Sequence, residues 1–156
     1  STSTNQNVNS INPYHPEGSS NLQYIRVNTP YTVPAGKTFY LSTEQNNLYL
    51  NNVGNVVEFI EEFPLPIQES SVLTWSGGVQ QIGGYLIDKG FEVVNYLGNN
   101  TSYTVPNNYH LYILGRADWI TVNGNLLDVD IILPIVLQPG DIVSSQKGFN
   151  ALLIPN

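Results

Sequence analysis

Short runs of apolar residues alternate with polar positions along most of the chain, and clusters of Gly, Pro and Asn separate the runs. Runs of about four to eight residues rich in Val, Ile, Leu, Tyr, Phe and Thr, divided in this way, are typical of the strands of a β-sandwich or barrel. The helical period of about 3.6 residues is sustained nowhere. The pattern therefore predicts an all-β protein.

The predicted strands fall into two groups, one on each side of residues 98–102. The first group covers 24–27, 38–42, 47–51, 55–61, 72–75, 79–87 and 91–96, and the second covers 109–114, 118–122, 125–132, 141–144 and 148–154. Asn51-Asn52 and Asn123-Gly124 lie between apolar runs, where a tight hairpin needs positive φ angles that Asn and Gly adopt easily. Pro139-Gly140 predicts a turn with the glycine in the left-handed region.

The chain also repeats itself. YTVPAGKTFYL at 31–41 returns as YTVPNNYHLYI at 103–113, an offset of 103 − 31 = 72. FPLPIQESSVL at 63–73 returns as LPIVLQPGDIV at 133–143, where the offset has fallen to 133 − 63 = 70, as a loop two residues shorter would produce. The repeat predicts a first β module at 21–97, a linker at 98–102 and a second β module at 103–156, preceded by an extended N-terminal arm at 1–20.

The expected architecture is a tandem β-sandwich or jelly-roll-like repeat. The two modules form either one shared core or two separate ones. A module of this length buries little apolar surface alone, so we expect the modules to pack against each other or against a neighbouring subunit.

Three phrases resemble β modules that recur in bacteriophage virion proteins and bacterial surface proteins: VPAGKTFYL, the turn LPIVLQPGDIV, and the closing GGYLI or FNALLI. The resemblance covers residues 31–87 and 103–154. It implies a non-catalytic structural, attachment or decoration role. The PGDIV turn is also similar to turns of cupin-like jelly rolls, but the metal-binding His and Glu positions of that family are missing.

Five basic residues stand against twelve acidic ones, which gives a net charge of −7. The five cations are scattered singly, so no nucleic-acid partner is expected, because such binding needs clustered Lys and Arg. No apolar run approaches the roughly 18 residues of a membrane span, so membrane insertion is not expected either. Charged residues make up 11% of the chain, about half the usual share. A surface of amides, hydroxyls and tyrosines suits a virion, extracellular or cell-surface protein.

Residues 1–20 are polar, interrupted by prolines and without apolar periodicity. Such a segment is expected to be disordered alone, because it buries too little to offset its ordering entropy. One hypothesis is that Ile11, Pro13, Tyr14 and His15 engage a neighbouring copy or another structural protein of the same assembly. The alternative is that the arm folds back over its own domain.

Catalytic and metal-binding motifs are missing. The sequence contains no GxSxG or HExxH spacing, and its two histidines are His15 and His110, the second an ordinary residue of a predicted strand. Asp128 and Asp130 are weak candidates for a Ca²⁺ site, the alternative being a solvated strand face. The glutamates at 58, 61 and 62 suggest either the carboxylate pair of a glycosidase or an exposed strand end. No enzymatic activity and no cofactor are expected.

Ten tyrosines and two tryptophans remain as candidate contacts. Trp75 precedes Ser76-Gly77-Gly78 and is expected either in the core or at a loop mouth, where it would contact a ligand together with Tyr85 and Tyr96. Its repeat counterpart is Ser145. Trp119 is expected in the core. The alternative function is therefore a carbohydrate-binding or receptor-binding module.

Overall fold

The computed structural model describes residues 23–43, 48–51, 53–55, 64–77, 80–98, 101–116, 119–127 and 134–156. Strands, turns and extended segments make up these ranges, and none of them contains a helix. The same ranges accordingly hold no helix with the length and apolarity needed to cross a membrane. The all-β prediction is confirmed.

The first half of the chain forms two four-stranded antiparallel sheets. Its strands are β1 (Gln23–Asn28), β2 (Tyr31–Thr32), β3 (Lys37–Leu41), β4 (Leu48–Leu50), β5 (Val53–Asn55), β6 (Leu65–Ile67), β7 (Val72–Trp75) and β8 (Gln81–Asp88). Sheet A has the order β1-β8-β3-β6, and sheet B has the order β2-β7-β4-β5. The pairing brings together strands that are far apart in the sequence, such as β1 and β8.

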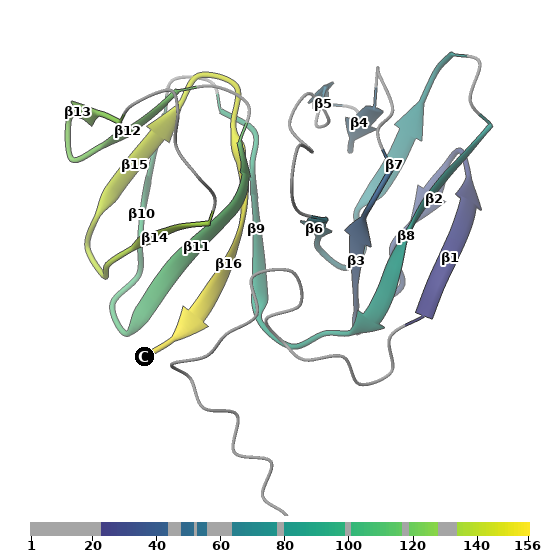
Figure 1. Ribbon diagram of the computed structural model, residues 1–156, viewed down its shortest axis with the longest axis horizontal. Helices are drawn as coiled ribbons and strands as arrows, with labels where there is room; N and C mark the ends of the chain where they lie inside the picture. The colour runs from purple at the N-terminus through teal and green to yellow at the C-terminus, as the bar shows by residue number, and fades with distance from the viewer. Residues whose placement is uncertain are drawn as a thin grey trace, which may run out of the picture.

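The second half repeats this arrangement. Its strands are β9 (Glu92–Tyr96), β10 (Ser102–Thr104), β11 (Tyr109–Arg116), β12 (Ile120–Val122), β13 (Asn125–Leu126), β14 (Ile135–Leu137), β15 (Ile142–Ser145) and β16 (Phe149–Pro155). Sheet C has the order β14-β11-β16-β9, and sheet D has the order β10-β15-β12-β13. Raising each strand number of sheets A and B by eight gives sheets C and D. Figure 1 shows the two halves side by side, with β6 and β9 between them.

The boundary between the halves differs from the prediction. β9 was expected in the first module, but it pairs with β16 in sheet C, where it occupies the place that β1 has in sheet A. Residues 89–91 therefore connect the two halves, and residues 97–101 lead from β9 to β10. The alternation in 92–96 predicts a strand correctly, but alternation carries no information about which strand will be its partner.

Four short strands were not predicted: β2, β6, β10 and β14. Each has only two or three residues, and prolines border or occupy three of them, Pro30 before β2, Pro66 within β6 and Pro134 before β14. β6 is at the end of sheet A, which is where a strand tolerates proline, because an edge strand does not need every N–H.

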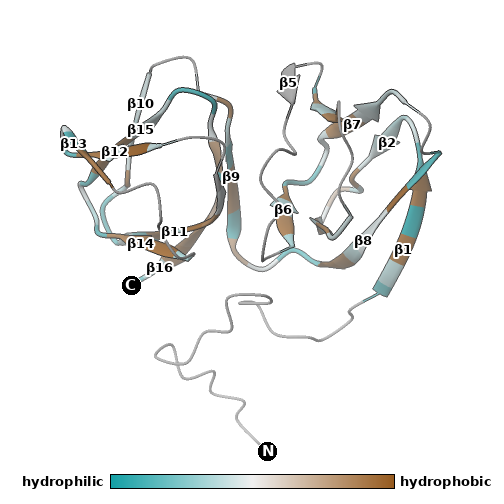
Figure 2. Ribbon diagram, turned by 45° about the horizontal axis from the view of Figure 1, so that its top comes forward, coloured by the Kyte–Doolittle hydropathy of each residue, from teal (hydrophilic) through white to brown (hydrophobic). Residues whose placement is uncertain are grey.

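Each half has its own apolar core between its two sheets. Phe39, Leu73 and Trp75 belong to the first core, and Ile113 and Phe149 to the second. Apolar and polar residues alternate along strands such as β1 (Figure 2), so that one face of the strand is directed inward. Burial of each large apolar side chain stabilises the fold by about 1.5–3 kcal/mol.

The predicted turns are present and have the same role in both halves. Asn51 and Asn123 both have φ 51°, and Gly140 has φ 85°. The Asn51 side-chain oxygen accepts a hydrogen bond from the Val72 N–H at 2.8 Å, and that of Asn123 accepts one from the Ile142 N–H at 2.9 Å. These repeated asparagines hold the starts of β7 and β15, so their presence in both copies is explained by folding.

Candidate interaction surfaces

The two halves meet where β6 lies against the outer face of sheet C. The Asn95 side-chain amide donates to the Pro66 carbonyl oxygen at 2.9 Å, and its oxygen accepts from the Gln68 N–H at 3.1 Å. The same amide group also donates to the Asn150 side-chain oxygen at 2.6 Å. One side chain of the second half thus binds both an acceptor and a donor of the β6 segment.

Asn95 belongs to a row of residues that crosses three strands. Asn95 is opposite Asn150, and Asn150 is opposite Gly115; we call these three residues the Asn row. Their neighbours Val94 and Ala151 contribute to the core of the second half, so the Asn row lies on the outer face of sheet C. A Cβ atom on Gly115 would collide with the Leu65 side chain. The glycine therefore lets β6 approach the sheet closely.

The polar part of the contact is largely buried. Asn150 is only 4% exposed, and Pro66 is buried. A buried amide is tolerated only when it is hydrogen-bonded, because an unpaired buried polar group costs about 1–3 kcal/mol. Sequence reasoning missed Asn95 and Asn150; the available signal was an asparagine inside the apolar run FNALLI, where the first copy has Gly83.

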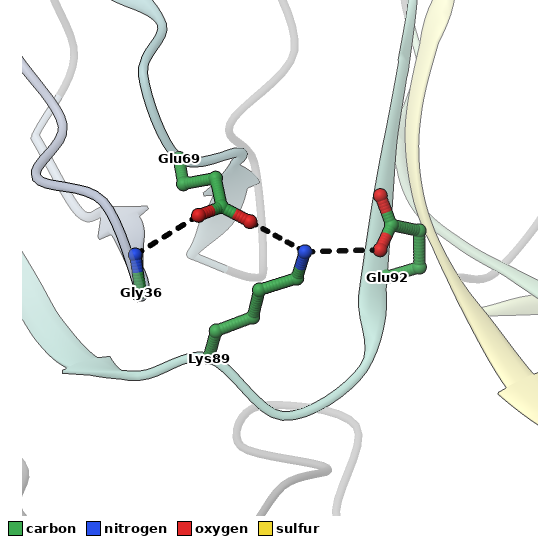
Figure 3. Close-up of polar contacts among 4 residues, drawn as sticks. All are labelled: Gly36, Glu69, Lys89 and Glu92. Carbon is green, nitrogen blue, oxygen red and sulfur yellow. Dashed lines mark hydrogen bonds and ion pairs between the residues drawn. The ribbon is translucent and has the colours of Figure 1, made fainter.

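A second tie between the halves lies at the connection 89–91, shown in Figure 3. Lys89 Nζ is 2.5 Å from Glu69 Oε2 and 3.1 Å from Glu92 Oε2. Glu69 follows β6 in the first half, whereas Glu92 begins β9 in the second, and the other Glu69 oxygen accepts from the Gly36 N–H at 2.9 Å. The hydrogen bonds from Lys89 and Gly36 lower the pKa of Glu69, and those to Glu69 and Glu92 raise the pKa of Lys89.

This tie predicts a pH-dependent effect of Lys89→Met. Because the pKa of Glu69 is lowered in the folded protein, its contribution is complete above the ordinary value of 4.5 and is lost as the pH falls below it. Because the pKa of Lys89 is raised, its contribution is complete below the ordinary value of 10.5 and is lost as the pH rises above it. Lys89→Met is therefore expected to lower the Tm slightly at about pH 7, since exposed ion pairs contribute little, and to lower it by progressively less as the pH falls below 4.5.

Thermal unfolding measured across this pH range checks the prediction. Glu69→Gln is the partner variant, and the double variant should lose less than the sum of the two single losses. A Tm difference between wild type and Lys89→Met that persisted unchanged in acid would contradict the assigned role of Glu69.

The first half carries a counterpart of the Asn row. Arg26 is opposite Gly83, whose carbonyl oxygen accepts a hydrogen bond from the Ser42 N–H at 3.0 Å; we call Arg26, Gly83 and Ser42 the Arg row. Arg26 is exposed. Beside it, the Tyr24 ring packs edge-on against Tyr85 at 5.4 Å, and Tyr24 is 52% exposed. Within the Arg row, Arg26 is thus open to solvent, whereas Gly83 is buried and the Tyr24 hydroxyl lies over it.

The structure decides between the two alternatives for Trp75 and corrects the expectation for Trp119. Trp75 is 7% exposed and belongs to the first core, so core packing, and not a loop-mouth ligand contact, describes its position. It is opposite Leu48 in sheet B, and this register directs the ring inward. Trp119 was expected in the core but is 55% exposed. Its neighbour Ile120 occupies the core position, and the strand period of two then directs Trp119 away from the core.

The two predicted contact tyrosines are both half-buried. Tyr85 packs against Tyr24, as described above. The Tyr96 ring stacks on Phe149 with centroids 4.8 Å apart, and its hydroxyl is hydrogen-bonded to Thr101. The structure does not bring Tyr85 or Tyr96 together with Trp75 on an exposed surface. Burial raises the pKa of Tyr31 and, with the nearby charge of Glu92, that of Tyr103.

Several predicted residues lie outside the described ranges. These are the arm residues Ile11, Pro13, Tyr14 and His15, the aspartates Asp128 and Asp130, and the glutamates Glu58, Glu61 and Glu62. His110 lies in β11, where its Nε2 is 3.0 Å from Gln138 Oε1. In the part of the chain that the structure describes, no three His, Asp or Glu side chains are grouped so that they could hold a metal ion.

Comparisons of the chain with models of known protein families, with curated proteins and with solved structures found no match. The functional interpretation therefore depends on the surfaces described above. The contact between the halves is the most completely defined of them, because its donors, acceptors and burial are all described.

Proposed function

We propose that this protein is a non-catalytic structural subunit that assembles with further copies of itself. A phage virion, as a decoration, fibre or tail component, or an extracellular appendage is the setting that fits its low charge and its polar, amide-rich surface. The arm at 1–20 contributes to this self-association. Assembly partners are other copies or other structural proteins of the same particle.

We further propose that each half is a jelly roll. This is supported by the strand order, in which strands 1-8-3-6 and 2-7-4-5 of each half form the two sheets of an eight-stranded double-sheet sandwich. Jelly rolls of this kind are used in viral capsids and in lectins. Since a fold alone does not specify a function, the proposal depends mainly on the surfaces.

The contact between the halves is the observation that carries the proposal. In it, a sheet edge of one module is bound by the outer sheet face of another module of the same fold, through the half-buried Asn95 and the buried Asn150. The two modules of one chain already bind each other through these surfaces. Modules of the same fold in different chains therefore have surfaces of the kind needed to bind one another. Association of this type requires no catalytic group.

The test is the native mass of the full chain as a function of concentration, measured by multi-angle light scattering. We expect masses above the 17.3 kDa of one chain, rising with concentration. Deletion of residues 1–20 is expected to leave a folded β protein whose mass is reduced at each concentration. A full chain that stays monomeric throughout would overturn the proposal, and a deletion without effect would remove the arm from it.

Glycan binding is a second candidate, favoured by the position of Trp119. Thr121 of β12 is opposite Leu126 and Ser144, so these residues share the outer face of sheet D. Trp119 is 55% exposed and Leu126 58% exposed. An exposed indole beside hydroxyl groups offers both a flat apolar surface and hydrogen bonds. Glycans that bind should change the tryptophan fluorescence, and Trp119→Ala should abolish the change; a glycan array without binding would exclude this candidate.

A further inference from the structure

We propose that two copies of this chain associate through the open edge of β1, which pairs with β1 of the second copy. This inference rests on the proposed function, because it names a surface through which the subunit assembles. The two strands would run antiparallel about a two-fold axis at Ile25, so that sheet A of one copy continues into sheet A of the other.

β1 differs from the other edge strands of the described sheets. Most of these have only two or three residues: β2, β5, β6, β10, β13 and β14. β9 has five residues, and its Asn95 binds the β6 segment of the same chain. β1 has six residues in unbroken register with β8 and contains no proline. Proteins commonly prevent strand addition by shortening an edge or by placing prolines or bulges in it, and β1 has none of these features.

The main-chain groups of Arg26 are directed toward the open edge. Arg26 is opposite Gly83 in β8. The Gly83 carbonyl oxygen accepts from the Ser42 N–H at 3.0 Å, and the Gly83 N–H donates to Thr43 Oγ1 at 2.9 Å. Both partners follow β3, so both Gly83 groups are directed away from β1. Arg26 and Gly83 therefore form a pair without mutual hydrogen bonds, and the N–H and C=O of Arg26 are directed away from β8.

Two further residues of β1 present the same groups. The direction of the N–H and C=O groups alternates along a strand, so Tyr24 and Asn28 also direct theirs toward the open edge. Tyr24, Arg26 and Asn28 are all exposed. Among the described residues, no main-chain hydrogen bond of a turn or loop reaches them. Figures 1 and 2 show β1 at the right-hand margin, with β8 on its inner side.

Charge and proline select the register of the pairing. An axis at Ile25 places Tyr24 of each copy opposite Arg26 of the other, so that the two residues exchange both of their main-chain hydrogen bonds. An axis at Arg26 would place two like charges directly opposite each other, which is unfavourable. An axis at Val27 would place Tyr24 opposite Pro30, which has no N–H to donate. The axis at Ile25 avoids both conflicts.

The side chains on both faces of β1 suit this register. On the outer face, Tyr24 is 52% exposed, and Arg26 of the other copy would lie beside its ring, where a cation is attracted. On the inner face, Ile25 and Val27 are half-buried and pack against the first core. Ile25 would contact its counterpart across the axis, and the apolar surface buried there stabilises association. Arg26 thus disfavours one alternative register and is accommodated in this one.

Arg26→Pro and Arg26→Ala in the full chain test the main-chain pairing. Both variants remove the guanidinium group, but only proline removes the outward N–H, and the edge strand tolerates it because no bond to β8 is lost. One N–H is lost from each copy. The concentration at which the mass rises above 17.3 kDa is therefore expected to be about tenfold higher for Arg26→Pro than for Arg26→Ala. Light scattering measures the masses, and circular dichroism confirms that both variants are folded.

Cysteine cross-linking of the full chain tests the partner and the register. The sequence contains no cysteine, so each variant carries a single thiol. Tyr24→Cys of one copy and Arg26→Cys of the other would be opposite, with Cα atoms about 5.5 Å apart, which suits a disulfide. Two copies of the same variant would be offset by two residues, beyond the limit of about 7 Å. An oxidised equimolar mixture is therefore expected to form disulfide-linked dimers at least about tenfold faster than either variant alone.

Ile142→Cys is the control for cross-linking by random collision. Ile142 is 46% exposed and lies in sheet D, so its mixture with Arg26→Cys should cross-link slowly. Equal masses for Arg26→Pro and Arg26→Ala, or a Tyr24→Cys and Arg26→Cys mixture that reacts no faster than the control, would overturn the pairing through β1. If the wild type still associates, the proposed function survives that result. A wild-type chain that is monomeric at every concentration would overturn both.

Discussion

Asn95→Leu is expected to lower the free energy of unfolding by about 2–4 kcal/mol, because it leaves several partly buried groups without partners. The Pro66 carbonyl loses its donor, the Gln68 N–H loses its acceptor, and the Asn150 side-chain oxygen loses its donor. Leucine keeps the branched arrangement of side-chain heavy atoms and leaves no cavity, so the loss reports mainly on hydrogen bonding. Urea unfolding of the two proteins measures the difference.

A double-mutant cycle with Asn150→Leu separates the pair from its surroundings. Since the two side chains share a hydrogen bond, the double variant should lose less than the sum of the single losses, by about 0.5–3 kcal/mol. The control is Asn125→Leu at an exposed position of β13, where a change within about 0.5 kcal/mol is expected. Additive losses for Asn95 and Asn150 would show that the network does not act as a unit.

Gly148→Ala is expected to cost about 3–5 kcal/mol, the sum of a strained φ angle and overpacking. Gly148 has φ 114°, and a Cβ atom there would collide with the carbonyl oxygen of Tyr96 and contact the backbone of Leu97 at 3.1 Å. Backbone atoms in a paired strand move away much less easily than a flexible side chain. The collision lies at the end of the β9–β16 pair and so weakens the strand that carries the Asn row.

Gly140→Ala is the matched control for this variant. Gly140 also has a positive φ, 85°, but nothing lies within 4 Å of its Cβ position. Only the cost of the left-handed conformation remains, about 1–2 kcal/mol. Chemical denaturation of both variants should therefore rank Gly148→Ala well below Gly140→Ala in stability, and equal losses would contradict the role assigned to the collision.

The sequence predicted those features that depend on neighbouring residues. The strand at 72–75 coincides with β7, and the turns at Asn123-Gly124 and Pro139-Gly140 have the expected positive φ angles. Short strands such as β6 were missed, because three residues with a central proline show no usable alternation. The sequence left Trp75 either in the core or at a loop mouth, because its neighbours Ser76 and Gly77 say nothing about the register with Leu48 that directs it into the core.

The sequence by itself determined the all-β class, the duplication and the positions of the turns, because alternation, repeated phrases and the conformational freedom of Asn and Gly are local properties. Only the tertiary structure decided that β9 belongs to the second half, that Trp119 is exposed, and that Asn95 and Asn150 form the contact between the halves. Each of these features depends on which distant strand lies alongside and which face it covers. Long-range pairing sets those relations, and a one-dimensional pattern of apolar and polar residues does not record them.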